Sequence, residues 1–389
     1  MKRVLHVMGS LERSGMEMML MSSSGQWRRA GYSCDVLATK RDIGPLAEPM
    51  RSAGYRIWHI PFRSISGRYL PNRRLIPEFF TLCKENKYDI VHIHTEAATP
   101  IFALLAKLAG VRSVVLSVHN TFLFDGILRV RKKLERMLIR AIGGRYGMVS
   151  DAVMECERAR FHNTGVRLWN WLDTEYFRPP SDAERRAARQ SLGCGDDQFV
   201  FVSVANCNTA KNHSALLRAI PRIKPDVSPL YLHVGKEQPE RPELILAEHL
   251  GVENEVRFVG SQPDPRLFFW AADVFVMPSL HEGLAISPLE AIASGCPAVL
   301  AEVSGLKEIA AETEWAISVM PDEESIAAGL SRAAAIPVEV RRSRALEDSA
   351  RIRECFSMQR GVQVMIESLY AVPSLEIIHS TDAAKQQLS

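Results

Sequence analysis

Residues 280–297 read LHEGLAISPLEAIASGCP and place two glutamates, Glu282 and Glu290, eight positions apart around apolar residues. The run VFVMP (274–278) comes just before them and predicts a buried strand, so Glu282 falls in the loop at the strand end. Ser287 and Pro288 match an N-cap and a first helical position, and they predict a helix from Pro288 to Ser294 that Gly295 ends. Strand, loop and helix in this order are typical of a parallel α/β sheet.

The same alternation runs along the whole chain. Apolar runs separated by helical segments appear in two series: RVLHVM (3–8), CDVLAT (34–39), YRIWHI (55–60), DIVHIH (89–94) and SVVLSVH (113–119), then FVFVSVA (199–205), YLHVG (231–235), VRFVG (256–260) and PAVLA (297–301). The paired prolines that end WNWLDTEYFRPP (169–180) indicate a boundary near residue 175. We predict two Rossmann-like, doubly wound parallel-sheet domains, residues 1–175 and 176–356, that face a cleft. Ligands of such sheets bind beyond the C-terminal strand ends.

Composition narrows the class of protein. The chain has 389 residues, 47% hydrophobic and 24% charged, as soluble globular proteins do. Its seven cysteines are scattered, odd in number and without a CxxC pair, which argues against a disulfide framework or a zinc ribbon. No apolar segment approaches the roughly 18 residues that span a bilayer, and the apolar run at the N-terminus is too short for a signal peptide. We expect a cytoplasmic protein.

The net charge of +3 conceals an asymmetry between the halves. Residues 1–180 carry 28 basic and 16 acidic residues, whereas residues 181–389 carry 20 and 29. The first half is expected to meet an anionic membrane surface or a phosphorylated acceptor, and no nucleic acid; alternatively, the two domains simply attract each other. Basic residues interleaved with apolar ones over 129–145 predict an amphipathic helix that rests on anionic lipid at the membrane periphery, or else an ordinary solvated helix face.

The two glutamates have competing interpretations. Glu290, three residues after Ser287, fits the acidic member of a capping box. Glu282 sits beside Gly283, where backbone amides can approach a ligand, and the following helix start offers free N–H groups to a phosphate. A carboxylate next to a phosphate is unfavourable unless it faces hydroxyl groups. A nucleotide sugar carries both kinds of group and resolves the conflict.

The stretch LHEGLAISPLEAIASGCPAVLA (280–301) resembles the E-x7-E motif of the retaining group 1 (family 4) glycosyltransferases. This resemblance implies the GT-B fold, whose C-terminal helix, expected over about residues 357–375, crosses back to the N-terminal domain. It implies transfer of a sugar from a nucleotide-diphosphate sugar with retention of configuration, and neither a cofactor nor a metal. The implied acceptor is a lipid-linked glycan or a surface-polysaccharide precursor, at the inner face of the cytoplasmic membrane.

The resemblance also assigns roles in the C-terminal domain. Lys211, in SVANCNTAKNHSALLRA (203–219), takes the place of the lysine that grips the donor diphosphate, and Asn206 stands upstream where the family often has an arginine. Glu282 is expected on the donor sugar and Glu290 on the ribose hydroxyls. The amides of Gly283 and Leu284 are expected to stabilise the leaving phosphate.

Two further positions come from the N-terminal domain. Gly15, in LERSGMEMML (11–20), matches the second glycine of the family's GGAExxL turn near the donor phosphates, with Ser14 in place of the first. His119, in SVHNT (117–121), matches a histidine that faces the transferred sugar. The simpler interpretations are a helix-entry glycine and a buried core histidine.

Other features remain open or are disfavoured. His92 and His94 share one face of a strand, as two metal ligands would, but no HExxH accompanies them and the family commonly has this pair without a metal. Trp171 replaces the glycine of the interdomain hinge, and Glu308 is expected to be structural. The alternative functions are a nucleotide-sugar 2-epimerase of the same fold and a non-catalytic nucleotide-sugar-binding subunit at the membrane.

Overall fold

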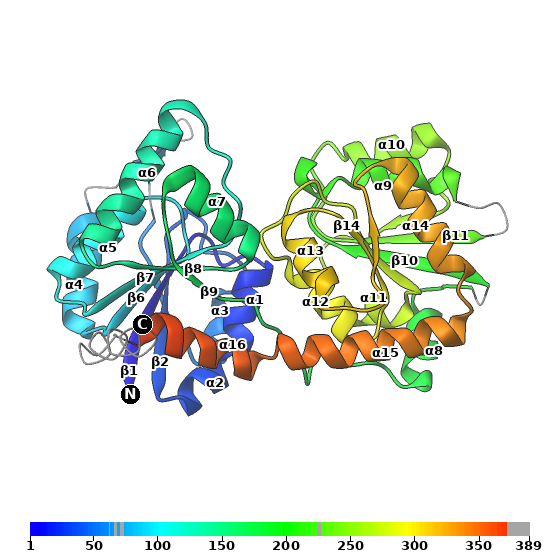
Figure 1. Cartoon of the computed structure of the whole chain (residues 1–389). Helices are drawn as coiled ribbons and strands as arrows, with labels where there is room; N and C mark the ends of the chain where they lie inside the picture. Colours follow the sequence, from blue (N-terminus) through cyan, green and yellow to red (C-terminus); the bar gives the residue numbers. More distant parts are fainter. Residues whose placement is uncertain (62, 66–67, 71–73, 196, 224–226, 372–389) are drawn as a thin grey trace, which may run out of the picture.

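The computed structural model describes the chain except residues 62, 66–67, 71–73, 196, 224–226 and 372–389. The described residues form two lobes, each built on a parallel sheet with helices on both faces (Figure 1). The first sheet has the order β3-β2-β1-β6-β7-β8-β9. Its strands are β1 (Lys2–Met8), β2 (Tyr32–Ala38), β3 (Arg56–His59), β6 (Ile90–Ile93), β7 (Ser113–Val118), β8 (Arg145–Met148) and β9 (Val166–Arg167). A separate antiparallel pair consists of β4 (Arg63–Ile65) and β5 (Arg68–Leu70).

The second sheet has the order β12-β11-β10-β13-β14-β15, also parallel throughout. Its strands are β10 (Gln198–Val204), β11 (Ser228–Val234), β12 (Val256–Phe258), β13 (Val274–Met277), β14 (Ala298–Ala301) and β15 (Ile317–Val319). The predicted fold of two doubly wound domains is confirmed. Five strands of the described part were not predicted from the sequence: β4, β5, β9 and β15 are too short to stand out, and glycines and a basic residue obscure β8.

The helices pack on the two faces of each sheet. The first lobe has α1 (Gly15–Ser22), α2 (Ser24–Arg29), α3 (Ala47–Ser52), α4 (Leu75–Asn86), α5 (Thr99–Leu108), α6 (Gly126–Ala141) and α7 (Asp151–Phe161). The second has α8 (Asp182–Ser191), η1 (Thr209–Lys211), α9 (His213–Ala219), η2 (Ile220–Arg222), α10 (Pro242–Leu250), α11 (Arg266–Ala271), α12 (Ile286–Ala293), α13 (Ser304–Ala311), α14 (Glu323–Ala335) and α15 (Val338–Cys355). Within the described ranges, no helix combines the length and apolarity needed to cross a bilayer.

Strand order decides where each lobe can bind a ligand. The strand order reverses direction at one point in each sheet, between β1 and β6 and between β10 and β13. The connections that follow the two strands at this point run on opposite faces of the sheet. Open α/β sheets bind ligands at that point, beyond the carboxyl ends of the strands. The loops that leave it carry Gly15, His94, Lys211 and Glu282, so the topology brings these predicted residues to the facing edges of the two sheets.

The chain crosses between the lobes twice, and the two crossings are paired. The amide of Leu172 donates to the carbonyl of Phe356 at 3.0 Å, and the amide of Met358 donates back to Leu172 at 3.0 Å. Beyond this pairing α15 gives way to α16 (Met358–Met365) and a π-helical turn, η3 (Ile366–Tyr370), that pack on the first lobe (Figure 1). The predicted return helix is present from residue 358; its expected end, residues 372–375, lies outside the described part.

Trp171, where the family has a small hinge glycine, is buried at this crossing. A Cβ added to Gly361 of α16 would lie 2.5 Å from the Trp171 ring, closer than real carbon contacts come. The missing side chain at Gly361 therefore makes room for the indole. The large residue in the hinge and the small one in the returning helix are complementary.

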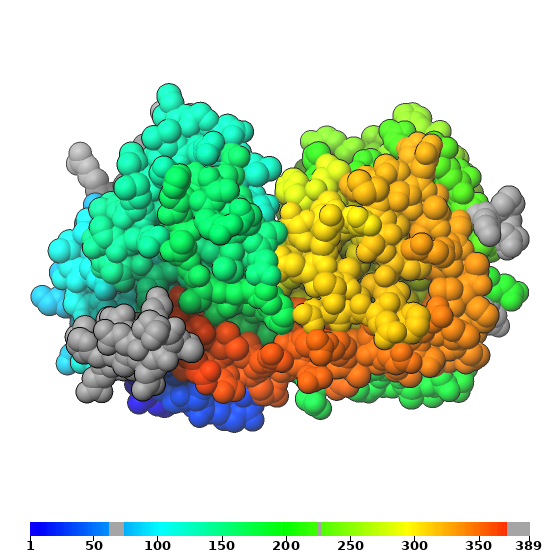
Figure 2. Space-filling view, in the orientation of Figure 1, coloured from blue at the N-terminus to red at the C-terminus, as the bar shows by residue number. Residues whose placement is uncertain are grey.

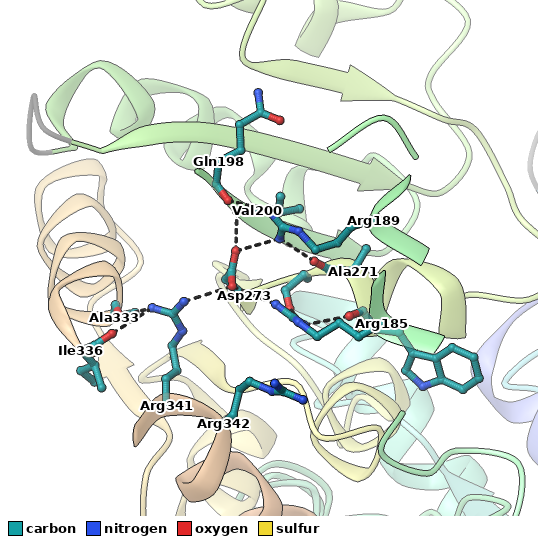
Figure 3. A network of polar contacts seen from close by, with 12 residues as sticks. Arg185, Arg189, Gln198, Val200, Ala271, Asp273, Ala333, Ile336, Arg341 and Arg342 are labelled. Atoms are coloured by element: carbon teal, nitrogen blue, oxygen red, sulfur yellow. Dashed lines mark hydrogen bonds and ion pairs between the residues drawn. The ribbon is translucent and has the colours of Figure 1, made fainter. Parts of the chain in front are cut away.

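Asp273, just before β13, ties the outer helices of the second lobe to its sheet (Figure 3). Its carboxylate accepts from Arg185 of α8 at 2.9 Å, from Arg189 of α8 at 3.2 Å and from Arg341 of α15 at 3.0 Å. The three guanidiniums also donate to backbone carbonyls, among them those of Ala271, Ala272 and Ala333. One buried acid thus fixes the first helix of the lobe and the helix that leads back out of it.

The helix predicted from residues 129–145 is oriented unlike an ordinary surface helix. Two of its basic residues point inward: Arg136 contacts Glu157 at 2.6 Å and Lys132 contacts Glu96 at 3.2 Å. Its apolar residues face solvent, with Ile127 88%, Val130 59%, Leu134 58% and Met137 53% exposed. The predicted amphipathic helix ends at Ala141, and the last predicted basic residue, Arg145, belongs to strand β8 instead.

Candidate functional site

Lys211 and Glu282 form an ion pair at the carboxyl edge of the second sheet, with Nζ and Oε1 2.7 Å apart. Lys211 is the last residue of the short helix η1. The backbone amide of Lys211 donates a hydrogen bond to Asn208 Oδ1 at 3.2 Å. The loop after β13 is tied to the same turn, because the amide of Leu280 donates to the carbonyl of Ala210 at 2.8 Å. Two residues 71 positions apart are thereby held side by side.

Gly283 brings the backbones of the two lobes into direct contact. A Cβ at this position would lie 2.0 Å from the carbonyl oxygen of His119, so only glycine permits the approach. The next carbonyl, that of Leu284, accepts from Asn170 Nδ2 of the hinge at 2.6 Å. Within the described part of the chain the amides of Gly283 and Leu284 donate no hydrogen bond. Both residues are buried where the lobes meet.

The predicted start of the next helix, α12, is wrong. It begins at Ile286 with Ala285 as N-cap, and no side chain caps it, so Ser287 is not the N-cap and Glu290 belongs to no capping box. Pro288 lies in the first turn, where its missing N–H costs no hydrogen bond. Gly295, with φ of +72°, ends the helix as predicted.

Glu290 therefore has no capping role. It lies in the second turn of α12, and burial, with a smaller contribution from the charge of Asp264, raises its pKa to about 7. The carboxyl group is poised to lose its proton near neutral pH, or when a hydrogen-bond donor approaches.

Gly15 and Asn206 occupy different surroundings. Gly15 is the first residue of α1, and a Cβ there would lie 3.0 Å from Ile286 Cδ1 at the start of α12, so the glycine loop of one lobe packs on the helix start of the other. Asn206 is exposed, and its Oδ1 accepts from the amide of Lys236 at 2.9 Å. Its side chain connects the loops after β10 and β11.

His119 follows β7 and belongs to a row of histidines that the sequence analysis did not connect. Its Nε2 lies 3.1 Å from His94 Nδ1, and His94 Nε2 lies 3.0 Å from His6 Nδ1. These residues come from three adjacent strands, and the parallel register places His6 opposite His92. Local sequence gives no sign of such contacts, because strand order alone creates them.

The tautomers of the three histidines are coupled. Burial lowers the pKa of His119 to about 4 and that of His6 to about 3, so the rings are neutral at pH 7. Each neutral ring has one N–H, and each of the two ring-to-ring contacts needs one donor, so both hydrogen bonds run in the same direction along the row. The Nδ1 of His119 is therefore a donor when His6 donates from its Nδ1, and an acceptor when His6 carries its proton on Nε2.

The disfavoured metal interpretation of His92 and His94 can be set against their contacts. Ring nitrogens of His6, His92 and His94 lie within 4.8 Å of one another. Both nitrogens of His92 are engaged, by the Tyr370 hydroxyl at 2.8 Å and by Ser117 Oγ at 2.8 Å. Since no carboxylate or thiol among the described residues joins the group, it fits a hydrogen-bonded cluster that anchors Tyr370 of the returning segment.

Glu308, expected to be structural, joins the two lobes. Its carboxylate accepts from the amides of Asp151 at 2.9 Å and Ala152 at 3.0 Å, the first two of helix α7. The third amide, of Val153, is capped by Ser150 Oγ at 3.1 Å. An acidic side chain of the second lobe thus satisfies the N-terminus of a helix in the first.

The chain is similar in sequence to known glycosyltransferases. Residues 184–351 match the model for "Glycosyl transferases group 1" and residues 13–175 that for "Glycosyltransferase Family 4". The chain is 30% identical over 318 residues to the putative glycosyltransferase EpsF of Bacillus subtilis, covering 77% of this chain and 79% of the relative. It is 24% identical over 282 residues to an Escherichia coli UDP-Gal:alpha-D-GlcNAc-diphosphoundecaprenol alpha-1,3-galactosyltransferase, covering 70% and 72%.

Solved structures match the fold. Anabaena HepE in complex with UDP and glucose superposes with a TM-score of 0.80 over 96% of this chain and 100% of that one, at 18% identity. WaaG, a glycosyltransferase involved in lipopolysaccharide biosynthesis, superposes with a TM-score of 0.73 over 93% and 99%, at 17% identity. Two facing Rossmann-like lobes with a returning helix are therefore the GT-B arrangement.

Proposed function

This chain belongs to the group 1 glycosyltransferases, and on that premise we propose that it transfers a sugar from a nucleotide-diphosphate sugar to an acceptor hydroxyl with retention of configuration. The observation that carries the proposal is the Lys211–Glu282 ion pair, placed beside free amides where the two lobes meet. HepE, whose fold this chain shares, was solved with UDP and glucose. The E. coli relative is named for a UDP-linked sugar donor.

The donor is expected to lie across the edge of the second sheet. The Lys211 ammonium would hold the diphosphate, and the amides of Gly283 and Leu284 would complete its binding. Glu282 would then exchange its contact with Lys211 for the hydroxyls of the transferred sugar, and Glu290 would accept from the ribose. Asn206 contributes no charge, so the diphosphate depends mainly on Lys211.

Retention is proposed to follow front-face attack. The bond between the anomeric carbon and the departing phosphate oxygen breaks, the acceptor oxygen bonds to the same face of that carbon, and the leaving phosphate takes the acceptor proton. Neutral His119 would hydrogen-bond a sugar hydroxyl and add no charge. Contact between the lobes at Gly283 and at Glu308 would exclude water that otherwise hydrolyses the donor. The step needs no metal in this proposal.

The donor half is tested by a thermal-shift screen against UDP-, GDP- and ADP-linked sugars. We expect one nucleotide series to raise the melting temperature, since a ligand that binds only the folded state stabilises it. Incubation with that donor alone should leave its sugar unaltered, whereas a 2-epimerase would change it. If no series binds at millimolar concentration, the proposed donor site is wrong.

We further propose that helix α6 binds the first lobe to an anionic bilayer, where a lipid-linked acceptor would reside. Its solvent-facing side combines apolar Ile127, Leu134 and Met137 with exposed Arg129 and Arg140. Exposed Leu104 and Leu108 of the adjacent helix α5 extend the apolar area. Apolar side chains flanked by cations suit the boundary between lipid headgroups and acyl chains.

Vesicle sedimentation tests this contact. The wild type should sediment with vesicles of phosphatidylglycerol and phosphatidylcholine, and less with phosphatidylcholine alone. The double variant Ile127→Ser/Leu134→Ser should lose most binding, whereas Leu346→Ser, which removes a similarly exposed leucine of α15, should not. Equal binding by all three proteins would contradict the assignment.

A further inference from the structure

A buried group of four side chains lies beneath the loop that carries Lys211. Cys207 follows β10, His213 begins α9, His233 lies in β11 and Glu243 in the first turn of α10. All four are buried. One ligand atom each from Cys207, His213 and His233 lie within 4.8 Å of one another.

Several polar atoms of this group have no partner. His213 Nε2, His233 Nδ1 and Glu243 Oε2 are buried without a hydrogen bond in the described part of the chain. The other carboxylate oxygen of Glu243, Oε1, accepts from Gln238 Nε2 at 3.5 Å. Unsatisfied buried atoms that gather at one place are a usual sign of a bound ion or water.

We propose that Cys207, His213 and His233 bind one zinc ion, with water at the fourth position. Cys207 Sγ and His233 Nε2 lie 3.4 Å apart, and tetrahedral zinc with ordinary bond lengths separates a sulfur and a nitrogen ligand by about 3.6 Å. One thiolate and two imidazoles form a ligand set that suits zinc. On binding, the Cys207 thiol releases its proton to solvent.

The surroundings of His213 fit a ligand. Its Nδ1 lies 3.2 Å from the Tyr231 hydroxyl, which in turn lies 2.5 Å from Ser203 Oγ. Donation from Nδ1 to the tyrosine oxygen leaves the Nε2 lone pair free for a metal, as outer hydrogen bonds do in known zinc sites. The cluster of His6, His92 and His94 lacks this character, since it offers no anionic ligand and its rings bond to one another.

The ion would hold both ends of the segment from Cys207 to His213, which contains Lys211. Its role is therefore to position the loop after β10, and it takes no part in the transfer of a sugar. The site stands on its own residues and does not depend on the identity of the donor.

Cobalt titration of the full chain, freed of metal by a chelator, tests the site. We expect one equivalent of CoCl2 to produce the near-ultraviolet charge-transfer band of a cobalt thiolate and the visible bands of tetrahedral cobalt, both removed by ZnCl2. Absence of the charge-transfer band in the wild type overturns the proposal and leaves an S–H···N hydrogen bond between Cys207 and His233.

Variants assign the ligands. Cys207→Ser should lose the charge-transfer band, whereas Cys194→Ser, which changes another buried free cysteine of the same lobe, should keep it. Circular dichroism confirms that both variants are folded. A band that persists in Cys207→Ser places the metal elsewhere and contradicts the assignment; the wild-type titration decides the question if this variant does not fold.

Discussion

At Lys211 and Glu282, opposite charges lie 2.7 Å apart in a largely buried position, with side-chain exposures of 23% and 10%. The cost of removing both charges from water offsets much of their attraction, so the value of the pair lies in keeping an ammonium and a carboxylate ready for a ligand that carries both phosphate and hydroxyl groups. The family resemblance of the sequence assigned a donor-binding role to each residue. It could not predict that they contact each other before a donor arrives.

Glu282→Gln tests the carboxylate. The amide keeps the size of the side chain but loses the charge, so we expect transfer to fall by about 10²–10³-fold, as when one stabilising group of an active site is removed. The donor should still bind, because Lys211 and the amides remain. Initial rates and calorimetric binding measure the two effects separately. Unchanged turnover would contradict the role of Glu282 and favour a non-catalytic binding subunit.

Glu290→Gln tests the buried carboxyl through pH. Its folded pKa of about 7 exceeds the ordinary 4.5, so the folded state holds the proton more tightly than the unfolded chain does. This group's stabilising contribution is complete below pH 4.5 and is lost as the pH rises through 7. The amide side chain of Glu290→Gln has no proton to lose, so the variant is not destabilised as the pH rises. The melting temperature of Glu290→Gln minus that of the wild type should therefore increase from about pH 5 to about pH 8.

The control for this experiment is Glu302→Gln, which changes an exposed glutamate of the same lobe. A melting-temperature difference between Glu290→Gln and wild type that is the same at both pH values would show that the Glu290 pKa is not raised.

At the scale of elements, the N-terminus of α7 is completed by the other lobe. Glu308→Gln keeps one acceptor oxygen but removes the negative charge that stabilises the N-terminus of α7. The contact between the lobes should lose about 1 kcal/mol of free energy. The joined arrangement of the lobes should then be about fivefold less favoured. We expect a lower kcat/KM for transfer and a larger radius of gyration by X-ray scattering. The affinity for the nucleotide, which the second lobe is proposed to bind, should change little. Scattering identical to wild type would contradict the link.

Helix positions were predictable to within a few residues, as for α12 and for the start of the returning helix α16. Their exact starts and orientations were not, where tertiary contacts prevail. The capping signature at Ser287 and Glu290 is present in the sequence, yet α12 starts at Ile286, shortly after Gly283 packs against His119 of the other lobe. The orientation of α6 could not be predicted either. Arg136 points inward because it pairs with Glu157 of helix α7, which lies far from it in the sequence.

At the scale of the whole molecule, the two lobes meet along facing sheet edges and are spanned by α15 and α16; Figure 2 shows the notch between them. The alternating runs of the sequence predicted this architecture. They could not predict the fit of Trp171 to Gly361 or the row of histidines, because those contacts join residues far apart in the chain.

The carboxylate of Asp273 holds the spanning helix to the second lobe, and Asp273→Asn tests this (Figure 3). Arg341 and Arg185 would keep buried charges without their partner, so we expect the lobe to lose about 3–5 kcal/mol of unfolding free energy. Asp182→Asn, which removes the exposed partner of Arg342, should change stability little. Denaturant unfolding followed by circular dichroism measures both, and similar midpoints would contradict the role of Asp273.

We propose that Lys211 holds the diphosphate of an activated sugar where the lobes meet. Calorimetric titration with the donor identified by the thermal screen measures this directly. We expect a dissociation constant below about 1 mM and weakening of at least about tenfold in Lys211→Ala. The affinity of Lys84→Ala, which changes an exposed lysine of the first lobe, should equal that of the wild type. Equal affinity of Lys211→Ala and wild type would contradict it.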